Sequence, residues 1–383
     1  MQMKTQLVRT WDELAQLEAD WNRLWKSGGT CSREFYAFSF MRLMALHTGK
    51  GRGAPWCIVS RDRGGVVGIV PLFLSSQTVS RFRIGMKCIT FFPNELIQRH
   101  GFLGNIAAED AVPALVEHLR AEPFDLAVLC GLAEADATAL FGKLAACGVP
   151  CSLLQVNEPR GGQAGTASVD TCAIELPATF SEYLDARTPR FRAWFRRAER
   201  IGGTFGSVTV WRHVEGRQAL GQERSIEEMA QWIQEVRPHT WQARHRQWYG
   251  NYGPEFWAGL IEVAMAHGAL DLAFLLVDGK PVAYTFRLVS GRYARSCCTG
   301  YHEGFARMSP GVLLMTLLVK HSIEETGLRR IDMGGSRHYQ KTQLANYRDS
   351  GYEITVYGTT LKARMLYAYR KRRRRWHRFP AET

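Results

Sequence analysis

The sequence predicts an α/β (α+β) chain of two units, each with a mixed, mostly antiparallel sheet flanked by helices. At 383 residues, the chain exceeds the usual length of one domain. The glycine-rich stretch 158–168 has no periodic apolar pattern and is typical of a linker. A hairpin on each side of it shares one pattern, an apolar strand, a turn with Asp and Gly, and a second apolar strand. Two ordinary hairpins would look the same, so this echo only supports the two-unit prediction.

Helix and strand patterns alternate through the N-terminal unit, predicted as 1–160. Apolar residues at three- and four-residue steps from Trp11 to Trp25 predict an amphipathic helix. APWCIVSR and VVGIVPLFL follow as strands joined by a DRGG turn. The remaining segments are, in order, strand KCITFF, helix AVPALVEHLRAE, strand DLAVLC, helix ADATALFGKLAACG ended by Gly148, and strand VPCSLLQV.

The C-terminal unit, predicted as 161–360, opens with strand TCAIEL, a short helix from Phe180, an Arg-rich helix and strand SVTVWRHV. Two helices cover roughly 224–236 and 254–267. The run 270–302 predicts three consecutive antiparallel strands with Asp-Gly and Ser-Gly turns. It is followed by helix PGVLLMTLLVKHSIEETG, strand RRIDMGG, a helical stretch and strand YEITVYGTT. Residues 361–383 are predicted to form a separate basic helix or tail.

Cysteine usage and hydropathy predict a reduced, cytoplasmic protein. The nine cysteines are scattered, and several lie in apolar runs, where thiols behave as small buried hydrophobes. Their spacings match neither a zinc site nor a CxxC redox motif. The N-terminus lacks the apolar region of a secretory signal, and the longest apolar run, 312–319, is too short to span a bilayer. The chain is therefore expected to be soluble, or peripheral at the inner membrane surface.

The net charge of +13 is concentrated in two places. RKRRRRWHR, near the C-terminus, contains no acidic residue, and 187–200 contains six arginines and one glutamate. Such runs are often only solvated faces. They also attract polyanions, and coenzyme phosphates, tRNA or an anionic membrane surface would all fit.

Most common catalytic motifs are absent. The sequence contains no GxxxxGK[ST], HExxH or GxSxG motif, and no GxGxxG after a strand. The histidines are dispersed, so no metal site is predicted.

The helix start at Ser309-Pro310-Gly311 is a candidate anion site. Proline suits a first helical turn, serine caps helices, and glycine allows close approach to the backbone. Unpartnered amides near 311–313 would then bind an anion, with Arg307 adding charge. The alternative is a well-capped buried helix without a ligand.

A titratable cluster follows. Asp332 closes a strand, Gly334 and Gly335 come next, and Tyr339 and Lys341 lie within nine residues of Asp332. Open α/β sheets bind ligands at such strand ends. The alternative is structural, with Asp332 capping the loop, Tyr339 half-buried and Lys341 solvated.

The order of these elements resembles a known family. A strand hairpin, a loop, SPG, an apolar helix and D-x-G-G-x-x-x-Y-x-K are similar to the GNAT-type acetyltransferase domain of bacterial proteins, some linked to cellulose or exopolysaccharide biosynthesis. The wider group resembles the FemABX peptidyltransferases, which have two fused GNAT halves. The resemblance covers roughly 180–358 well and the N-terminal half loosely. It implies two tandem GNAT-like units, the N-terminal one degenerate.

The resemblance implies a coenzyme A thioester as the acyl donor, bound where two parallel strands splay apart. Its pyrophosphate would lie on the loop and helix start. The usual Q/R-x-x-G-x-G/A form is replaced here by Arg-Met-Ser-Pro-Gly. The residues implied in cofactor binding are Arg307, Ser309, Gly311, Val312, Leu313 and Lys341.

The resemblance also implies catalytic roles, since the attacking amine must lose a proton and the departing thiolate must gain one. Asp332 is the candidate base or amine-orienting group, and Tyr339 the candidate acid. Lys341 would hold phosphate or a substrate carboxylate. The substrate-binding candidates are Arg190, Trp241 and His302.

Three functions remain open. The first is CoA-dependent N-acyl transfer to an amine of a small molecule or of a sugar or peptide precursor. The second is aminoacyl-tRNA-dependent transfer, favoured by the clustered charge although no long charged heptad arm is present. The third is a non-enzymatic binding protein with a degenerate site. The acyl acceptor and the oligomeric state do not follow from the sequence.

Overall fold

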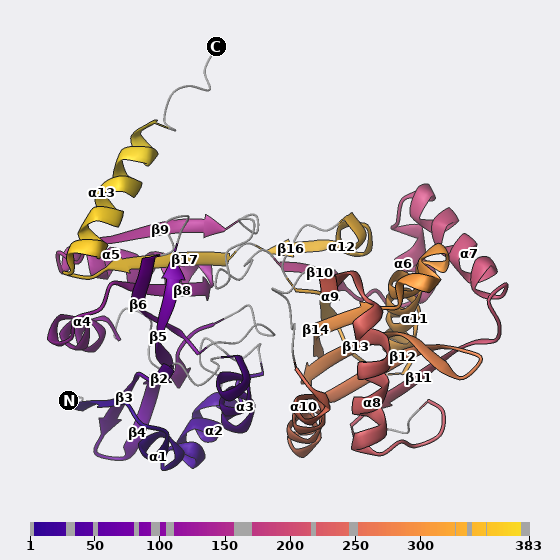
Figure 1. Cartoon of the computed structure of the whole chain (residues 1–383), viewed down its shortest axis with the longest axis horizontal. Coiled ribbons are helices and arrows are strands. Elements are labelled where there is room, and N and C mark those ends of the chain that lie inside the picture. Colours follow the sequence, from indigo (N-terminus) through magenta and orange to yellow (C-terminus); the bar gives the residue numbers. More distant parts are fainter. Residues whose placement is uncertain are drawn as a thin grey trace.

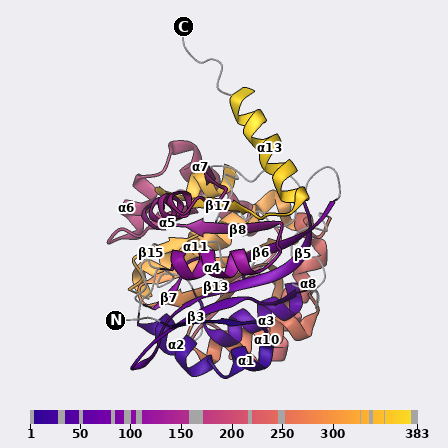
Figure 2. The same ribbon diagram turned by 90° about the vertical axis from the view of Figure 1, so that its left-hand side faces the viewer.

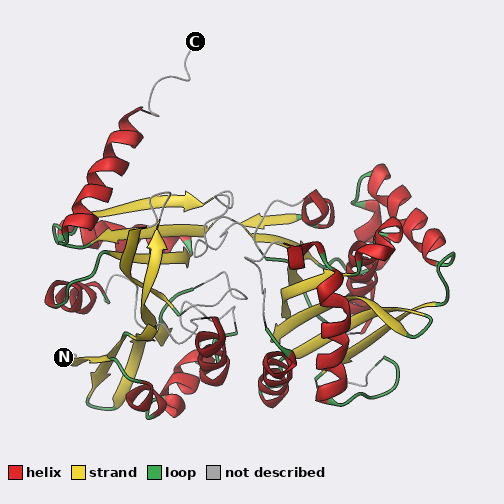
Figure 3. Cartoon of the chain, in the orientation of Figure 1, coloured by secondary structure: helices red, strands yellow, loops and turns green. Residues whose placement is uncertain are grey.

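The protein consists of two α/β halves that lie side by side (Figure 1). A computed structural model describes residues 4–27, 35–48, 53–79, 84–92, 100–104, 111–156, 171–215, 220–244, 252–325, 327–334, 339–349 and 351–376. The predicted linker 158–168 lies outside these residues. Helices flank the sheets in both halves (Figure 3), so the predicted fold class is confirmed.

The N-terminal half follows the predicted alternation, with the first amphipathic helix split in two. Its elements are β1 (Lys4–Val8), α1 (Trp11–Ala15), α2 (Glu18–Lys26), α3 (Phe38–Thr48), β2 (Gly53–Pro55), β3 (Cys57–Asp62), β4 (Gly65–Val70), β5 (Leu72–Val79), β6 (Ile84–Phe91), β7 (Leu103–Gly104), α4 (Val112–Ala121), β8 (Leu126–Leu132), α5 (Glu134–Ala146) and β9 (Cys151–Val156).

The C-terminal half contains the predicted three-stranded meander and the apolar helix after it. From residue 171 onward, the chain forms β10 (Thr171–Glu175), α6 (Phe180–Asp185), α7 (Pro189–Gly202), β11 (Val208–Val214), α8 (Ile226–Val236), η1 (Arg237–His239), α9 (Trp241–Arg244), α10 (Pro254–Ala266), β12 (Leu270–Val277), β13 (Lys280–Ser290), β14 (Tyr293–Tyr301), η2 (Glu303–Met308), α11 (Pro310–Glu325), β15 (Arg330–Asp332), α12 (Tyr339–Leu344), β16 (Tyr347–Asp349), β17 (Gly351–Tyr357) and α13 (Leu361–Trp376).

The last strand crosses between the halves. The C-terminal sheet has the order β11-β12-β13-β14-β15-β10-β16, and the N-terminal half holds β1-β3-β4-β7 and β2-β5-β6-β8-β17-β9. β17 lies in the range predicted for the C-terminal unit, yet it pairs with β8 and β9. The chain therefore returns to its first half before it ends, and the unit boundaries remain a prediction.

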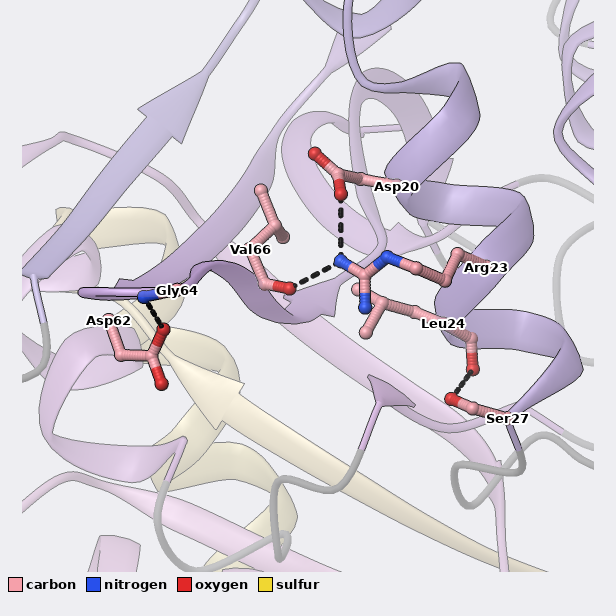
Figure 4. Close-up of polar contacts among 7 residues, drawn as sticks. All are labelled: Asp20, Arg23, Leu24, Ser27, Asp62, Gly64 and Val66. Atoms are coloured by element: carbon pink, nitrogen blue, oxygen red, sulfur yellow. Dashed lines mark hydrogen bonds and ion pairs between the residues drawn. The ribbon is translucent and has the colours of Figure 1, made fainter.

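Local polar contacts fix the first hairpin and the helix beside it (Figure 4). In the predicted DRGG turn, the Gly64 amide donates to Asp62 Oδ1 at 2.7 Å. Arg23 of α2 donates to the Val66 carbonyl of β4 at 2.6 Å and to Asp20 Oδ1 at 2.7 Å. The bond from Arg23 to Val66 thus attaches α2 to the hairpin.

One hydrophobic core joins the two halves. It runs from α2 and α3 to α8, α10, β12 and β13. His267, after α10, lies between them, where its Nε2 is 3.0 Å from Ser39 Oγ and its ring meets Trp25 and Phe35 edge-on. Burial lowers the pKa of His267, with a smaller effect from Lys26. The halves are thus packed together by apolar side chains.

Helix α13 is attached by its first turns and then stands away from the molecule (Figures 1 and 2). Thr360 accepts from the Ala363 amide, and its hydroxyl donates to Asp125 Oδ1. Ala363 is fully buried, and Tyr367 contacts Tyr357 with ring centroids 4.9 Å apart. No helix among the described residues is both long and apolar enough to cross a membrane.

Truncation after Ala368 is expected to leave the melting temperature almost unchanged. The docked side chains precede the cut, and the deletion removes the hydrogen bond that Arg370 donates to Tyr357 Oη, which contributes about 1 kcal/mol. Differential scanning fluorimetry measures the effect, and truncation after Thr360, which removes Ala363 and Tyr367 as well, is the control. A decrease of more than about 5 °C in the shorter deletion would show that the distal turns are docked.

Candidate active site

A parallel strand pair diverges at the centre of the C-terminal sheet. β14 pairs with β15 at Tyr293–Arg330, Ala294–Ile331 and Arg295–Asp332. Beyond this point β14 continues to Tyr301, whereas the chain after β15 follows β10, with the Met333 amide donating to the Cys172 carbonyl at 2.8 Å. Among the described residues, β14 and β15 do not pair beyond Arg295. The strands therefore splay apart from that residue pair.

An ion pair closes the narrow end of the splay. Arg295 Nη1 lies 2.6 Å from Asp332 Oδ2, and the two side chains are 6% and 19% exposed. Asp332 Oδ1 accepts from the Gly334 amide at 2.8 Å, across a turn where Gly334 has φ +76°. Both carboxylate oxygens are therefore engaged, and the carboxylate is held in one orientation.

Lys341 of α12 lies in the electrostatic field of this ion pair. Its side chain is half-buried. Burial, followed by the Arg295 charge, lowers the pKa of Lys341 to about 8, and smaller effects of Cys172 and Asp332 act in the opposite direction. With this pKa, a sizeable fraction of Lys341 is in the neutral amine form slightly above neutral pH. Tyr339 begins α12, but its side chain and residues 335–338 lie outside the described residues, so its role remains a prediction.

The turn before α11 is built differently from the predicted anion site. Ser309 has left-handed backbone angles, φ +50° and ψ +55°, and its Oγ accepts from Trp194 Nε1 at 3.1 Å. The Ser309 carbonyl accepts from the Val312 and Leu313 amides at 3.1 and 3.0 Å. The expectation that these amides are unpartnered is therefore wrong, because the Ser309 carbonyl turns inward to start the helix. The side chains of Val312 and Leu313 are buried in the core.

Arg307 and Gly311 remain on the accessible side of this turn. Arg307 is exposed at the end of η2. A Cβ atom on Gly311 would lie 3.5 Å from Tyr301 Cδ1, an ordinary contact, so the first atom of a side chain fits there. A longer side chain would project over the end of β14.

Of the predicted substrate residues, His302 lies at the end of β14, and Trp241 lies close in sequence to the residue that His302 contacts. The ring of His302 stacks on His239 at 4.2 Å, and Trp241 follows two residues after His239 at the start of α9. The Gly304 amide donates to His302 Nδ1 at 3.0 Å. Burial lowers the pKa of His302, with a further contribution from the His239 charge. His302 is therefore a neutral imidazole at neutral pH, with its proton on Nε2.

The third predicted substrate residue, Arg190, lies on helix α7. Arg190 is exposed in the first turn of α7, one turn before Trp194, whose indole binds Ser309. Sequence reasoning missed Trp194, Arg295 and His239. An arginine inside the apolar strand 293–301 was the available signal for Arg295, because a buried charge needs a partner.

The N-terminal half repeats the strand pair, but its splay is filled. β6 is parallel to β8 and pairs with it from Cys88 to Thr90. Further along β8, the His100 amide donates to the Gly131 carbonyl at 3.1 Å. The His100 ring is buried and stacks on Phe91 with centroids 5.2 Å apart. The chain itself occupies the position at which the C-terminal pair is open.

Comparisons with known proteins agree with this geometry. Residues 189–343 match the acetyltransferase (GNAT) domain family, and this range contains β14, α11 and β15. FemX superposes with a TM-score of 0.57 at 12% identity, over 92% of this chain and 97% of that one. A conserved protein of unknown function from Bacteroides thetaiotaomicron gives 0.50 at 12% identity, over 89% and 97%. No curated protein sequence gives a significant match.

The resemblance predicted from the sequence is confirmed. Residues 189–343 match the GNAT acetyltransferase domain family, and the likeness to FemX extends over both halves. At 12% identity, that likeness shows a shared fold.

Proposed function

We propose that this chain, whose residues 189–343 match the GNAT domain family, transfers an acyl group from a coenzyme A thioester to an amine. The main support is the open strand pair β14–β15, with the Arg295–Asp332 ion pair at its narrow end and Lys341 beside it. The filled splay of the N-terminal half supports placing the reaction in the C-terminal half. The acceptor would be an amine of a small molecule or of a sugar or peptide precursor in the cytoplasm.

In this proposal, the acyl donor lies along β14 beyond Arg295, and its phosphates lie at the turn from η2 to α11. Arg307 supplies an exposed positive charge there, and Gly311 leaves room for the phosphates. The neutral His302 can donate a hydrogen bond from Nε2 to the acceptor. These residues bind and orient the two substrates.

In the chemical step, the attacking amine loses one proton. The amine nitrogen attacks the thioester carbonyl, the C–N bond forms and the C–S bond breaks. Lys341, in its neutral form, takes the proton that the amine loses, and Tyr339 supplies one to the departing thiolate. Asp332 is better suited to orienting the amine than to accepting its proton, because both of its oxygens are already bonded.

Activity is expected to rise with pH, with a midpoint near the Lys341 pKa of about 8. Below that pH the ammonium form cannot accept a proton, so the rate should fall roughly tenfold for each further pH unit. Single-turnover thiol release between acidic and basic pH measures this profile, once an acceptor has been found in a panel of amino sugars, amino acids and polyamines. The Lys341→Met variant is the control, since a profile that persists in it belongs to the acceptor.

Gly311→Leu is expected to weaken acetyl-CoA binding by about tenfold or more, since the side chain would project where the phosphates are proposed to lie. Titration calorimetry measures the affinity. Gly142→Leu, on helix α5 of the N-terminal half, is the matched control, because a Cβ atom there meets nothing within 4 Å. An unchanged affinity in Gly311→Leu would count against this phosphate site.

A second candidate donor is aminoacyl-tRNA. Helix α7 is bonded through Trp194 to Ser309, in the turn before α11. The helix exposes four arginines, which are Arg190, Arg196, Arg197 and Arg200. Such a face would engage a nucleic-acid backbone by charge. Filter binding of tRNA over a range of salt concentrations tests it. Tight, salt-dependent binding that Arg196→Gln/Arg197→Gln weakens would favour this donor, and its absence would favour coenzyme A.

A further inference from the structure

Helix α13 carries an exposed apolar stripe that the proposed reaction does not use. Leu361, Met365 and Tyr369 are 74%, 65% and 48% exposed. They recur at four-residue steps, so they share one face of the helix. Among the described residues, the other exposed large hydrophobic residues are Leu46, at 52%, and Tyr293, at 41%. Three of these five exposed large hydrophobic residues thus lie together on one face of α13.

Basic residues border the stripe. The helix contains eight lysines and arginines and no acidic residue. Arg364, Lys371 and Arg372 are exposed, and Lys362 lies at the base of the helix, where its Nζ donates to the Gly85 carbonyl at 2.9 Å. The opposite face is docked, with Ala363 fully buried and Tyr367 against Tyr357. The first turns of the helix are thus held against the protein, and the helix presents an apolar, basic face on the side away from these contacts.

We propose that α13 docks this protein on an anionic membrane surface, with the stripe entering the interface and the basic residues facing lipid phosphates. An amphipathic helix of this kind lies in the plane of the interface. A lipid surface would cover the apolar stripe and neutralise the basic residues at the same time. A nucleic-acid backbone would pair with the charges but leave Leu361 and Met365 in water. A second copy would bring two wholly basic helices together.

Co-sedimentation of the full chain with vesicles tests the proposal. The wild type should bind phosphatidylcholine vesicles that contain about 30% phosphatidylglycerol, bind pure phosphatidylcholine only weakly, and lose binding as salt rises. Leu361→Gln/Met365→Gln/Tyr369→Gln should lower the partition coefficient roughly tenfold or more. Arg364→Gln/Lys371→Gln/Arg372→Gln should lower it by about a hundredfold, near fivefold for each charge.

The matched control removes the same charge elsewhere. Arg196→Gln/Arg197→Gln/Arg200→Gln, on the exposed face of α7, should bind vesicles like the wild type, and all variants should melt at the wild-type temperature because the altered residues on both helices are exposed. Equal loss in the α7 variant would overturn α13 as the docking surface.

Three other results would also overturn the proposal. One is wild type that does not sediment with anionic vesicles. The second is a stripe variant that binds as tightly as the wild type. The third is a wild type that does not bind vesicles but binds an RNA oligonucleotide, or that forms a dimer, detected by light scattering, which the stripe variant does not form. None of these readouts depends on acyl transfer, so the proposal can fail independently of the proposed function.

Discussion

Replacing Lys341 with methionine is expected to slow single-turnover acyl transfer by roughly 10²- to 10⁴-fold, the usual loss when a general base is removed. Methionine keeps most of the length of the lysine chain and fits a half-buried site, but it cannot accept a proton. Acetyl-CoA affinity should change little, because the proposed phosphate contacts are at Arg307 and Gly311. Thiol release in a rapid-quench assay measures the rate, and calorimetry the affinity.

Lys320→Met is the matched control, since Lys320 is a half-buried lysine on α11, away from the strand ends. Its rate should be close to that of the wild type. A near-normal rate in Lys341→Met would show that Lys341 is structural. If Lys341→Met instead binds acetyl-CoA more weakly but reacts at a normal rate at saturation, the result would support the role first predicted for Lys341, that of a phosphate ligand.

Asp332→Asn is expected to lower the free energy of unfolding by about 3–5 kcal/mol, the cost of removing one partner from a buried ion pair. The Arg295 side chain is only 6% exposed and would lose the Asp332 charge that lies 2.6 Å from its Nη1. Lys341, which already has a lowered pKa, would lose the Asp332 charge that raises its pKa. Urea unfolding measures the change, with an unaltered m-value as the check for two-state behaviour.

Two controls separate the charge from the change in shape. Glu175→Gln removes the carboxylate from the neighbouring Arg330 pair, in which Glu175 is 55% exposed, and should cost at most about 1 kcal/mol. Arg295→Leu/Asp332→Leu removes both charges and should recover most of the stability without recovering the rate. A loss in Asp332→Asn no larger than that in Glu175→Gln would show that water screens the Arg295–Asp332 pair.

Local patterns were enough to predict most elements of the C-terminal half. The apolar run after Pro310, and the Asp278-Gly279 turn with φ of +49° and +77°, each depend on residues close in sequence. The return of β17 to the first half could not be predicted in this way. Its pairing with β8 and β9 joins residues about two hundred positions apart, and an apolar strand fits either sheet equally well.

The residues of the site likewise differ in whether their partners are near or distant in the sequence. Asp332 and Lys341 were found because they are close together after a strand, whereas Arg295 and Trp194 were missed because their partners are distant in sequence. The amides of Val312 and Leu313 were misjudged for a different reason. The sequence indicates a helix start, but it does not indicate that Ser309 adopts left-handed angles and directs its carbonyl at them. The Ser309 hydroxyl also accepts a hydrogen bond from the Trp194 indole, which another helix supplies.

Hydrogen exchange with and without acetyl-CoA tests most directly whether the C-terminal half binds the acyl donor. The proposal predicts slower exchange for backbone amides of β14 beyond Arg295 and of the turn from His302 to Gly311. It predicts no change at β6 and β8, where His100 already fills the equivalent position. No protection anywhere at saturating acetyl-CoA, or protection confined to the N-terminal half, would contradict it.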